Sequence, residues 1–135
     1  MSNFTSHFFC YQFPAILWGI IIFVLSAIPS SKFPVFDIWE YDKFIHAGVF
    51  FVFGLLVYRA LELRMTSASI SWNRILWSVV TVVLYGLLTE LYQGSVPGRT
   101  LDLRDAVADA VGGILSAIVI FLYTRKKSNE MSSEI

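Results

Sequence analysis

The sequence predicts an all-α fold: an integral membrane bundle of about four transmembrane helices. Hydrophobic residues make up 56% of the 135 residues and aromatic residues 16%, whereas a soluble domain usually holds about 45–50% apolar residues. Four apolar runs each approach the roughly 20 residues that a helix needs to cross about 30 Å of hydrocarbon. Because these runs account for most of the chain, the sequence favours a single transmembrane domain over residues 1–127.

The predicted spans begin and end at recognisable signals. The first covers about residues 8–28, with Pro14 near its start and Pro29 as its stop. A cleaved signal peptide is the alternative for this run, but no Lys or Arg precedes it, and we favour a retained helix. A polar segment, 128–135, follows the last span and is expected to be a disordered tail. The remaining spans cover about residues 42–61, 72–93 and 105–123.

The distribution of Lys and Arg between the connections predicts that both termini are cytoplasmic. With four spans the two ends share one side of the membrane, and the side richer in Lys and Arg usually stays cytoplasmic. The connections around 29–43 and 93–105 are then expected outside, where five acidic side chains would make the surface net acidic: Asp37, Glu40, Asp42, Asp102 and Asp105. The inner side holds six basic residues, which are Arg59, Arg64, Arg74, Arg125, Lys126 and Lys127. The outer side holds four, which are Lys32, Lys43, Arg99 and Arg104.

Composition argues against several classes of function. Ten basic and ten acidic side chains cancel, so the chain lacks the broad positive field of a nucleic-acid-binding protein. Its single cysteine, Cys10, cannot form an internal disulfide, and no Cys/His spacing resembles a zinc site. The aromatic residues require no cofactor, because those near predicted interfaces suit the headgroup belt: Trp39, Tyr41, Trp72 and Tyr92. We expect neither a nucleic-acid partner nor a cofactor.

Three polar pairs on three helices are the candidate functional residues. Residues at i and i+3 or i+4 share a helix face, and because the spans alternate in direction, all three pairs lie at one membrane level and should meet. Ionised groups within a bilayer cost about 3 kcal/mol each on insertion scales, so they normally face the bundle interior and find partners. The deepest three, and the candidate metal ligands, are His46, Glu90 and Asp109. The pairs are Asp42 with His46, Glu90 with Gln93, and Asp105 with Asp109.

Each of these residues also has a structural interpretation. Asp42 and Asp105 stand at helix starts, where a carboxylate can cap the helix and complement its dipole. A single His near an interface is more often a satisfied structural group than a metal ligand. Glu90 could pair with Lys43 or Arg99 and remain ionised without a further role.

The segment 94–100 is predicted to be a tight turn. Pro97 fixes one φ angle and Gly98 supplies the next unusual one. The turn would hold Arg99 at the outer surface, where its guanidinium could bind phosphate or carboxylate in a bidentate way, or bridge Glu90 and Asp102. Small residues at four-residue intervals on the last span predict close helix packing: Ala108, Gly112 and Ser116.

In their order along the chain these motifs resemble the VanZ-like family, whose pattern is D-K-x-x-H, E-x-x-Q, P-G-R and D-x-x-x-N-x-x-G. The resemblance covers about residues 15–123. Two positions depart from the pattern: Asp109 stands where the family more often has Asn, and Ser116 where a second Gly is common. The matching residues are Asp-Lys-Phe-Ile-His at 42–46, Glu-Leu-Tyr-Gln at 90–93, Pro-Gly-Arg at 97–99, and Asp105 and Asp109 before Gly112.

The resemblance implies a small multi-pass protein of the bacterial inner membrane, and the founding member of the family is associated with resistance to the glycopeptide teicoplanin. Our main hypothesis is a non-enzymatic protein whose outward polar cluster binds a cell-envelope component, such as a lipid-linked cell-wall precursor or its headgroup. Arg99 and Lys43 would hold the anionic part, with Glu90, His46 and Asp109 orienting them. Membrane lipid or a glycopeptide are further candidate partners, and a homo-oligomer stays open.

Two other functions remain open from the sequence. His46 could act as a general base, or could ligate a divalent ion with Glu90 and Asp109, in support of hydrolysis or phosphoryl transfer. No complete catalytic motif is present, which favours a non-enzymatic role. The same groups are typical relay residues of a small proton- or ion-coupled transporter, which with four spans would need to oligomerise.

Overall fold

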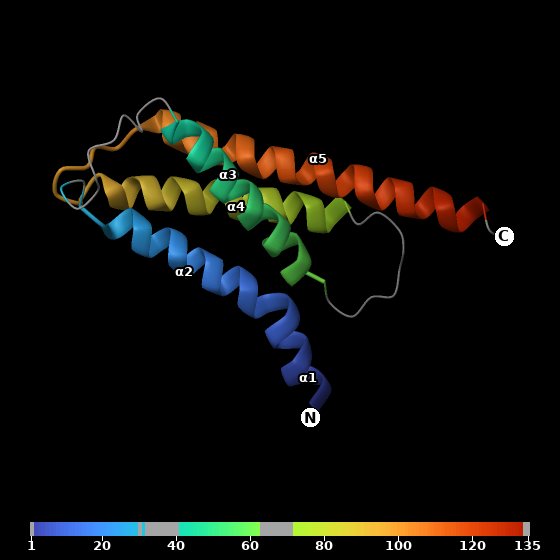
Figure 1. The fold of residues 1–135 in the computed structure, drawn as a ribbon. Helices are drawn as coiled ribbons and strands as arrows, with labels where there is room; N and C mark the ends of the chain where they lie inside the picture. Colours follow the sequence, from blue (N-terminus) through green and yellow to red (C-terminus); the bar gives the residue numbers. More distant parts are fainter. Residues whose placement is uncertain (1, 30, 32–40, 63–71, 134–135) are drawn as a thin grey trace.

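A computed structural model describes residues 2–29, 31, 41–62 and 72–133 (Figure 1). Within these residues all regular secondary structure is helical, which confirms the predicted all-α class. Predictions for Lys32, Asp37, Trp39, Glu40 and Arg64 lie outside the described residues. The elements are α1 (Ser2–His7), the π-helix η1 (Phe8–Gln12), α2 (Phe13–Ala27), α3 (Asp42–Ala60), α4 (Trp72–Gln93) and α5 (Leu103–Ser133).

Four helical stretches are long and apolar enough to cross a membrane, as the sequence predicted. Three of them lie close to the predicted spans; the last is longer. They cover Thr5–Ala27, Asp42–Ala60, Trp72–Gln93 and Leu103–Ser133.

The first span is a continuous helix made of α1, η1 and α2. Pro14 has no amide hydrogen to donate to the preceding turn, and that turn widens into η1, where the Phe13 N–H donates to the carbonyl oxygen of Phe8. At the other end Ile28 is extended, with φ −78° and ψ 124°, because a residue that precedes proline disfavours the helical conformation. Pro29 therefore ends the span as the sequence predicted, whereas Pro14, expected near its start, lies inside a continuous helix that begins before it.

The last helix extends farther than expected. Residues 128–133, predicted to be a disordered tail, are the final turns of α5. Adding residues to an existing helix is far easier than nucleating a new one, and the polar end is supported by an ion pair of 3.8 Å between Lys126 and Glu130. At 31 residues, α5 is about 46 Å long, which exceeds the thickness of the hydrocarbon layer.

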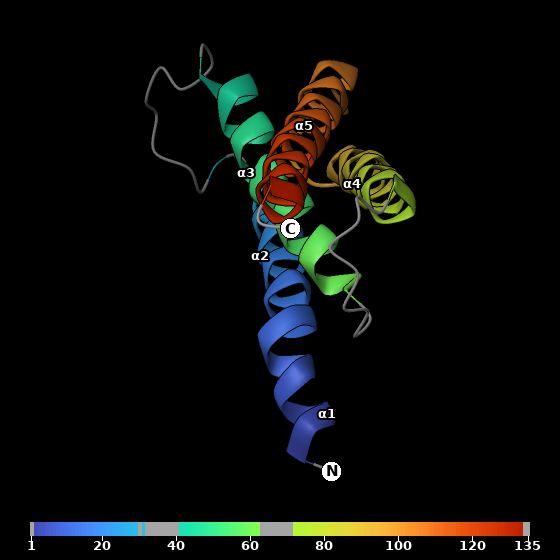
Figure 2. The same ribbon diagram turned by 90° about the vertical axis from the view of Figure 1, so that its right-hand side faces the viewer.

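The bundle is built around α3, α4 and α5, which pack against one another, while α2 packs on α3 and α4 (Figures 1 and 2). The small residues of α5 make the predicted close contact: a Cβ atom added at Gly112 would collide with the carbonyl oxygen of Ala47 and the amide nitrogen of Phe51. Helices α3 and α5 can therefore approach backbone to backbone. The buried apolar core consists of Ile22, Phe50, Phe53, Val57 and Val82.

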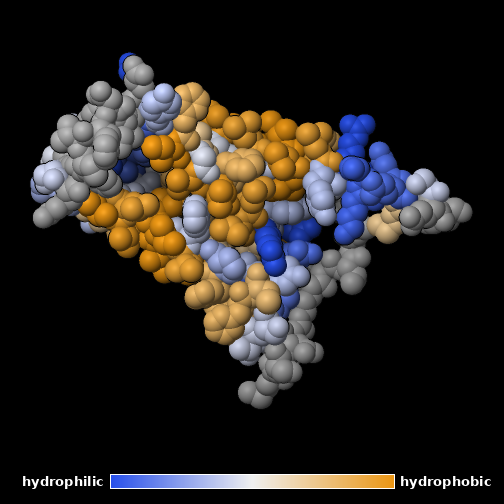
Figure 3. Space-filling view, viewed as in Figure 1, coloured by the Kyte–Doolittle hydropathy of each residue, from blue (hydrophilic) through white to orange (hydrophobic). Residues whose placement is uncertain are grey.

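The lateral surface of the bundle is apolar as well. Large hydrophobic side chains are exposed along α2, α4 and α5, among them Ile20, Leu88 and Leu122. Figure 3 shows this surface as a broad hydrophobic region, with hydrophilic residues gathered at the end on the right. Helices that are apolar on both their inner and outer faces are typical of membrane spans, so the chain is a multi-pass integral membrane protein.

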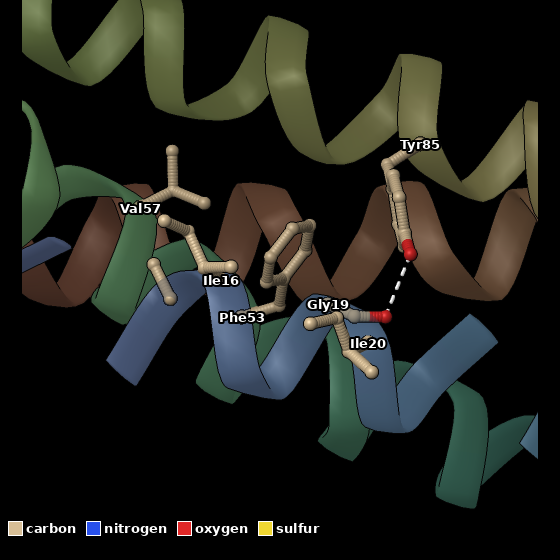
Figure 4. A pocket seen from close by; sticks show the side chains of 7 residues that line it. Ile16, Gly19, Ile20, Phe53, Val57 and Tyr85 are labelled. Carbon is tan, nitrogen blue, oxygen red and sulfur yellow. Dashed lines mark hydrogen bonds between the residues drawn. The ribbon is translucent and has the colours of Figure 1, made fainter. Parts of the chain in front are cut away.

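A groove opens between α2, α3 and α4, with a volume of about 360 Å³. Figure 4 shows the Tyr85 hydroxyl, which donates to the carbonyl oxygen of Gly19 at 2.6 Å, at one side of this groove. None of the candidate polar residues lines it, so the candidate chemistry lies elsewhere. The lining residues are Ala15, Ile16, Gly19, Ile20, Phe53, Val57 and Tyr85.

Candidate functional site

Polar side chains from three helices meet at one end of the bundle. The start of α3, the end of α4 and the start of α5 lie together at the left of Figure 1, beside the end of α2. The convergence that helix spacing predicted is thus present. We call this set the acid cluster, and it consists of Asp42, Lys43, His46, Glu90, Asp102, Asp105 and Asp109.

The buried part of the acid cluster is the deep group, formed by His46, Glu90 and Asp109. Both acidic side chains are only 1% exposed. Nδ1 of His46 lies 2.9 Å from Oδ1 of Asp109, and one donor atom from each of the three residues lies within 4.8 Å of the other two. Glu90 Oε2 accepts a hydrogen bond of 3.3 Å from the amide of Asp102. The deep group therefore joins α3, α4 and α5.

The outer part is the shallow group, which Lys43 holds together. The Lys43 ammonium donates to Asp102 Oδ2 at 3.1 Å and to Asp105 Oδ1, and lies 3.8 Å from Asp42 Oδ2. The side chains of Asp42, Lys43 and Asp102 are 34%, 38% and 41% exposed, against 11% for Asp105. His46 Nε2 faces this group at 3.8 Å from Asp42 and 4.0 Å from Asp105. The imidazole thus lies between the two groups.

The capping role that the sequence suggested for Asp105 belongs to Asp102. Asp102 Oδ1 accepts a hydrogen bond of 2.8 Å from the amide of Arg104 in the first turn of α5. This bond, followed by the hydrogen bond from Lys43, lowers the pKa of the Asp102 carboxyl below its usual value. Asp42 is the first residue of α3, and the preceding residue makes no side-chain cap. Its charge still complements the helix dipole.

Gln93 and Arg99, predicted to belong to the binding cluster, form a different network, which we call the Arg99 clamp. The Arg99 guanidinium donates to Gln93 Oε1 at 3.0 Å and to the carbonyl oxygens of Ile28 and Leu25 at 3.2 and 3.3 Å. Gln93 Nε2 in turn donates to the Ser26 hydroxyl at 3.4 Å. The last carbonyls of a helix have no helical donor, and the clamp satisfies two carbonyls at the end of α2.

The turn that carries Arg99 has the predicted form. The Arg99 amide donates to the carbonyl oxygen of Val96 at 3.1 Å, and Gly98 adopts a φ of 77°. Proline followed by a glycine of positive φ is typical of a type II turn. The sequence therefore predicted the turn correctly, while the partners of Arg99 came from the end of α2.

Gly86, which belongs to none of the sequence motifs, is needed by the deep group. A Cβ atom at Gly86 would lie 2.9 Å from both Cβ and Oδ2 of Asp109, so the missing side chain makes room for the Asp109 carboxylate. The available signal was its position four residues before Glu90, on the same face of α4. The sequence suggested Asp102 as an outer charge and as a residue that Arg99 could bridge, although an Asp directly before a helix is a typical N-cap.

The charge of the site differs from what a direct anion-binding role would require. The acid cluster holds five carboxyl groups against one lysine and one histidine. Lys43 and Arg99, which the sequence suggested as the two cationic contacts of a ligand, both donate to acceptors within the protein. The arrangement can bind a cation, orient an imidazole, or accept hydrogen bonds from hydroxyl and amine groups.

The fold and the site define a multi-pass membrane protein with a carboxylate–histidine cluster at one end of its helix bundle. The model of the VanZ/LLP1 family matches residues 8–124, and the chain belongs to that family. A relative from the fission yeast Schizosaccharomyces pombe, named uncharacterized protein C11E3.10, is 30% identical over 108 residues. The match covers 80% of this chain and 63% of the relative. No solved structure matches the chain.

Proposed function

We propose that this protein is a non-enzymatic membrane protein whose acid cluster binds the headgroup of a cell-envelope lipid. The headgroup would carry a phosphate together with hydroxyl or amine donors, as a lipid-linked precursor or a phospholipid does. The observation that carries this proposal is the shallow group, which presents Lys43 and two partly exposed carboxylates at the end of an otherwise apolar bundle.

The two kinds of side chain in the shallow group suit the two parts of such a headgroup. An ammonium is a compact charge that binds phosphate oxygens. Carboxylates accept several hydrogen bonds from hydroxyl or amine groups, and the side chains of Asp42 and Asp102 are partly exposed. A headgroup with only a phosphate would meet net repulsion, whereas one that also brings donors would replace the contacts that Lys43 makes in the free protein.

The identity of the membrane that contains this protein is also part of the proposal. The family resemblance suggests the bacterial inner membrane, and a link to glycopeptide resistance would follow if the ligand is a lipid-linked wall precursor. The relative that matches the chain comes from a fission yeast rather than from a bacterium. Headgroup chemistry, rather than one wall component, is therefore the part of the proposal that applies to the relative as well.

The test uses the full chain in lipid nanodiscs and compares headgroups by native mass spectrometry. Phosphatidylglycerol offers phosphate and hydroxyls, phosphatidylethanolamine offers phosphate and an amine, and phosphatidylcholine offers phosphate without N–H or O–H donors. We expect the protein to retain the first two lipids selectively. A polyprenyl-phosphate sugar is tested in the same way to represent a lipid-linked precursor. Lys43→Met should weaken retention by about tenfold or more, since one charge-assisted hydrogen bond is worth about 1.5–3 kcal/mol.

The matched control is Lys126→Met, because Lys126 is largely exposed on the charged end of α5. Equal retention of all headgroups, or equal effects of the two lysine variants in folded protein, would remove the proposal. Circular dichroism and Lys43→Arg, which keeps the charge, distinguish loss of binding from loss of fold.

A second candidate, hydrolysis of a phosphate ester, is favoured by the contact between His46 and Asp109. A carboxylate that holds one imidazole nitrogen orients the other as a general base, and Nε2 faces the partly exposed shallow group. Water would be the nucleophile. Phosphate release from a lipid phosphate that is abolished by His46→Ala, but not by His7→Ala at the chain's other histidine, would establish this activity. The absence of release by the wild type, tested with and without divalent ions, would exclude it.

A further inference from the structure

Two carboxylate oxygens in the deep group lack hydrogen-bond partners among the residues that the structure describes. They are Oε1 of Glu90 and Oδ2 of Asp109, and both side chains are 1% exposed. A buried polar atom without a partner is costly, and such atoms in native proteins usually mark a function or a bound ion or water. We therefore expect these two oxygens to contact a bound ligand.

The deep group also has the composition of a metal site. One donor atom each from His46, Glu90 and Asp109 lies within 4.8 Å of the other two. Ligand atoms bind ions such as Zn²⁺ from about 2.0–2.2 Å, so modest side-chain adjustment brings all three onto one ion. The ligands come from α3, α4 and α5, and an ion would therefore tie the three central helices together.

The distribution of cations separates the deep group from the shallow one. In the shallow group Lys43 neutralises the carboxylates. In the deep group, within the described parts of the chain, neither Glu90 nor Asp109 has a Lys or Arg within ion-pair distance, and only His46 lies against Asp109. Two buried carboxylates without a cation are strongly unfavourable in a membrane protein, and a divalent ion would neutralise both.

We propose that the deep group binds a divalent transition-metal cation through His46, Glu90 and Asp109. A mixture of one imidazole and two carboxylates suits Zn²⁺ or Mn²⁺ better than Ca²⁺, which prefers oxygen ligands alone. Three protein ligands leave at least one coordination position open. This inference rests on the proposed function and deepens it, because a phosphate oxygen of the headgroup would bind the ion in that open position.

The alternative for the deep group is that a proton, rather than a metal ion, neutralises its carboxyl groups. In that case Glu90→Gln would preserve the charge state and the shape, and added metal would change nothing. In the metal-bound case the same substitution removes an anionic ligand. Glu90→Gln therefore separates the two explanations.

The experiment uses the full chain in phosphatidylcholine nanodiscs, stripped with EDTA and then dialysed. Mn²⁺ binding is followed by the electron paramagnetic resonance signal of the free ion, and Zn²⁺ binding by competition with a chromophoric chelator. We expect a single saturable site in the wild type and a higher melting temperature when it is filled. Glu90→Gln and Asp109→Asn should weaken metal binding by at least about tenfold.

The matched control is Glu62→Gln, which changes a carboxylate beside Arg74, outside the acid cluster, and should bind metal as the wild type does. No saturable binding by the wild type, or undiminished binding by Glu90→Gln, overturns the inference. Headgroup retention in EDTA without any metal binding would overturn the inference and leave the proposed function standing. Metal binding without headgroup selectivity would support the inference and remove the proposed function.

Discussion

The Nδ1 atom of His46 on α3 lies 2.9 Å from Oδ1 of Asp109 on α5, and this contact holds the two helices together at the level of the acid cluster. The backbones of α3 and α5 also approach closely at Gly112. The polar contact and the close packing support each other, because a polar pair within the bundle is stable only where neighbouring helices exclude lipid.

Removal of this contact should destabilise the protein. We expect His46→Ala to lower the free energy of unfolding by about 1–3 kcal/mol, since Asp109 would be left buried without a partner. The measurement is unfolding by SDS in mixed micelles, in the presence of EDTA so that metal does not contribute. His7→Ala is the control, because His7 stacks on Tyr11 near the N-terminus. Equal effects of the two substitutions would contradict a stabilising role for the contact.

A methyl group at Gly86 should disturb the deep group. The new Cβ atom would lie 2.9 Å from Asp109 Oδ2, and we expect Gly86→Ala to cost about 1–3 kcal/mol by overpacking and to weaken metal binding. Gly48→Ala is the matched control, because nothing lies within 4 Å of a Cβ atom there. It should be neutral or stabilising by up to about 1 kcal/mol, since Ala favours helix. A stable Gly86→Ala variant with intact metal binding would refute the crowding argument.

Arg99 is expected to tether α2 rather than to hold the ligand. Arg99→Ala should increase amide hydrogen exchange at the end of α2, because the guanidinium would no longer bind the carbonyls of Leu25 and Ile28. Headgroup and metal binding should persist. Arg104→Ala, at an exposed side chain, provides the control. Loss of headgroup binding with unchanged amide hydrogen exchange would instead support the ligand-binding role that the sequence suggested for Arg99.

The charge of Asp102 should make a pH-dependent contribution to stability. Its pKa is lower in the folded protein than in the unfolded chain, because of the Arg104 amide and Lys43. The stabilisation is therefore present above the ordinary aspartate pKa and is lost as the pH falls through the lowered value. Asp102→Asn keeps an acceptor for Arg104 and removes the charge. We expect the wild type to melt higher than this variant at neutral pH, and the difference to shrink on acidification. A difference that does not vary with pH would contradict the assignment.

The positive-inside distribution predicts that both termini lie in the cytoplasm. In a Cys10→Ser background, Ser95→Cys at the exposed α4–α5 connection should react with a membrane-impermeant maleimide in intact cells. Ser132→Cys near the end of α5 should react only after permeabilisation. The opposite labelling pattern would place the acid cluster on the cytoplasmic side.

The sequence by itself determined the four spans, the turn at Pro97 and Gly98, and the common level of the polar pairs. These depend on local quantities: apolar length, the missing amide hydrogen of proline, and the alternating direction of successive helices. Helix spacing could therefore predict that His46, Glu90 and Asp109 would meet.

Only the tertiary structure decided which polar residues belong to the acid cluster and which belong to the Arg99 clamp. Gln93 and Glu90 are one turn apart on α4, yet Gln93 joins the Arg99 clamp beside α2 and Glu90 joins the deep group beside α3 and α5. Spacing along one helix shows which side chains share a face. The partner of each side chain depends on the rotation of that helix about its own axis and on the positions of the neighbouring helices along the bundle axis. Those two quantities are set by packing between helices, through contacts such as Gly86 with Asp109 and Gly112 with Ala47.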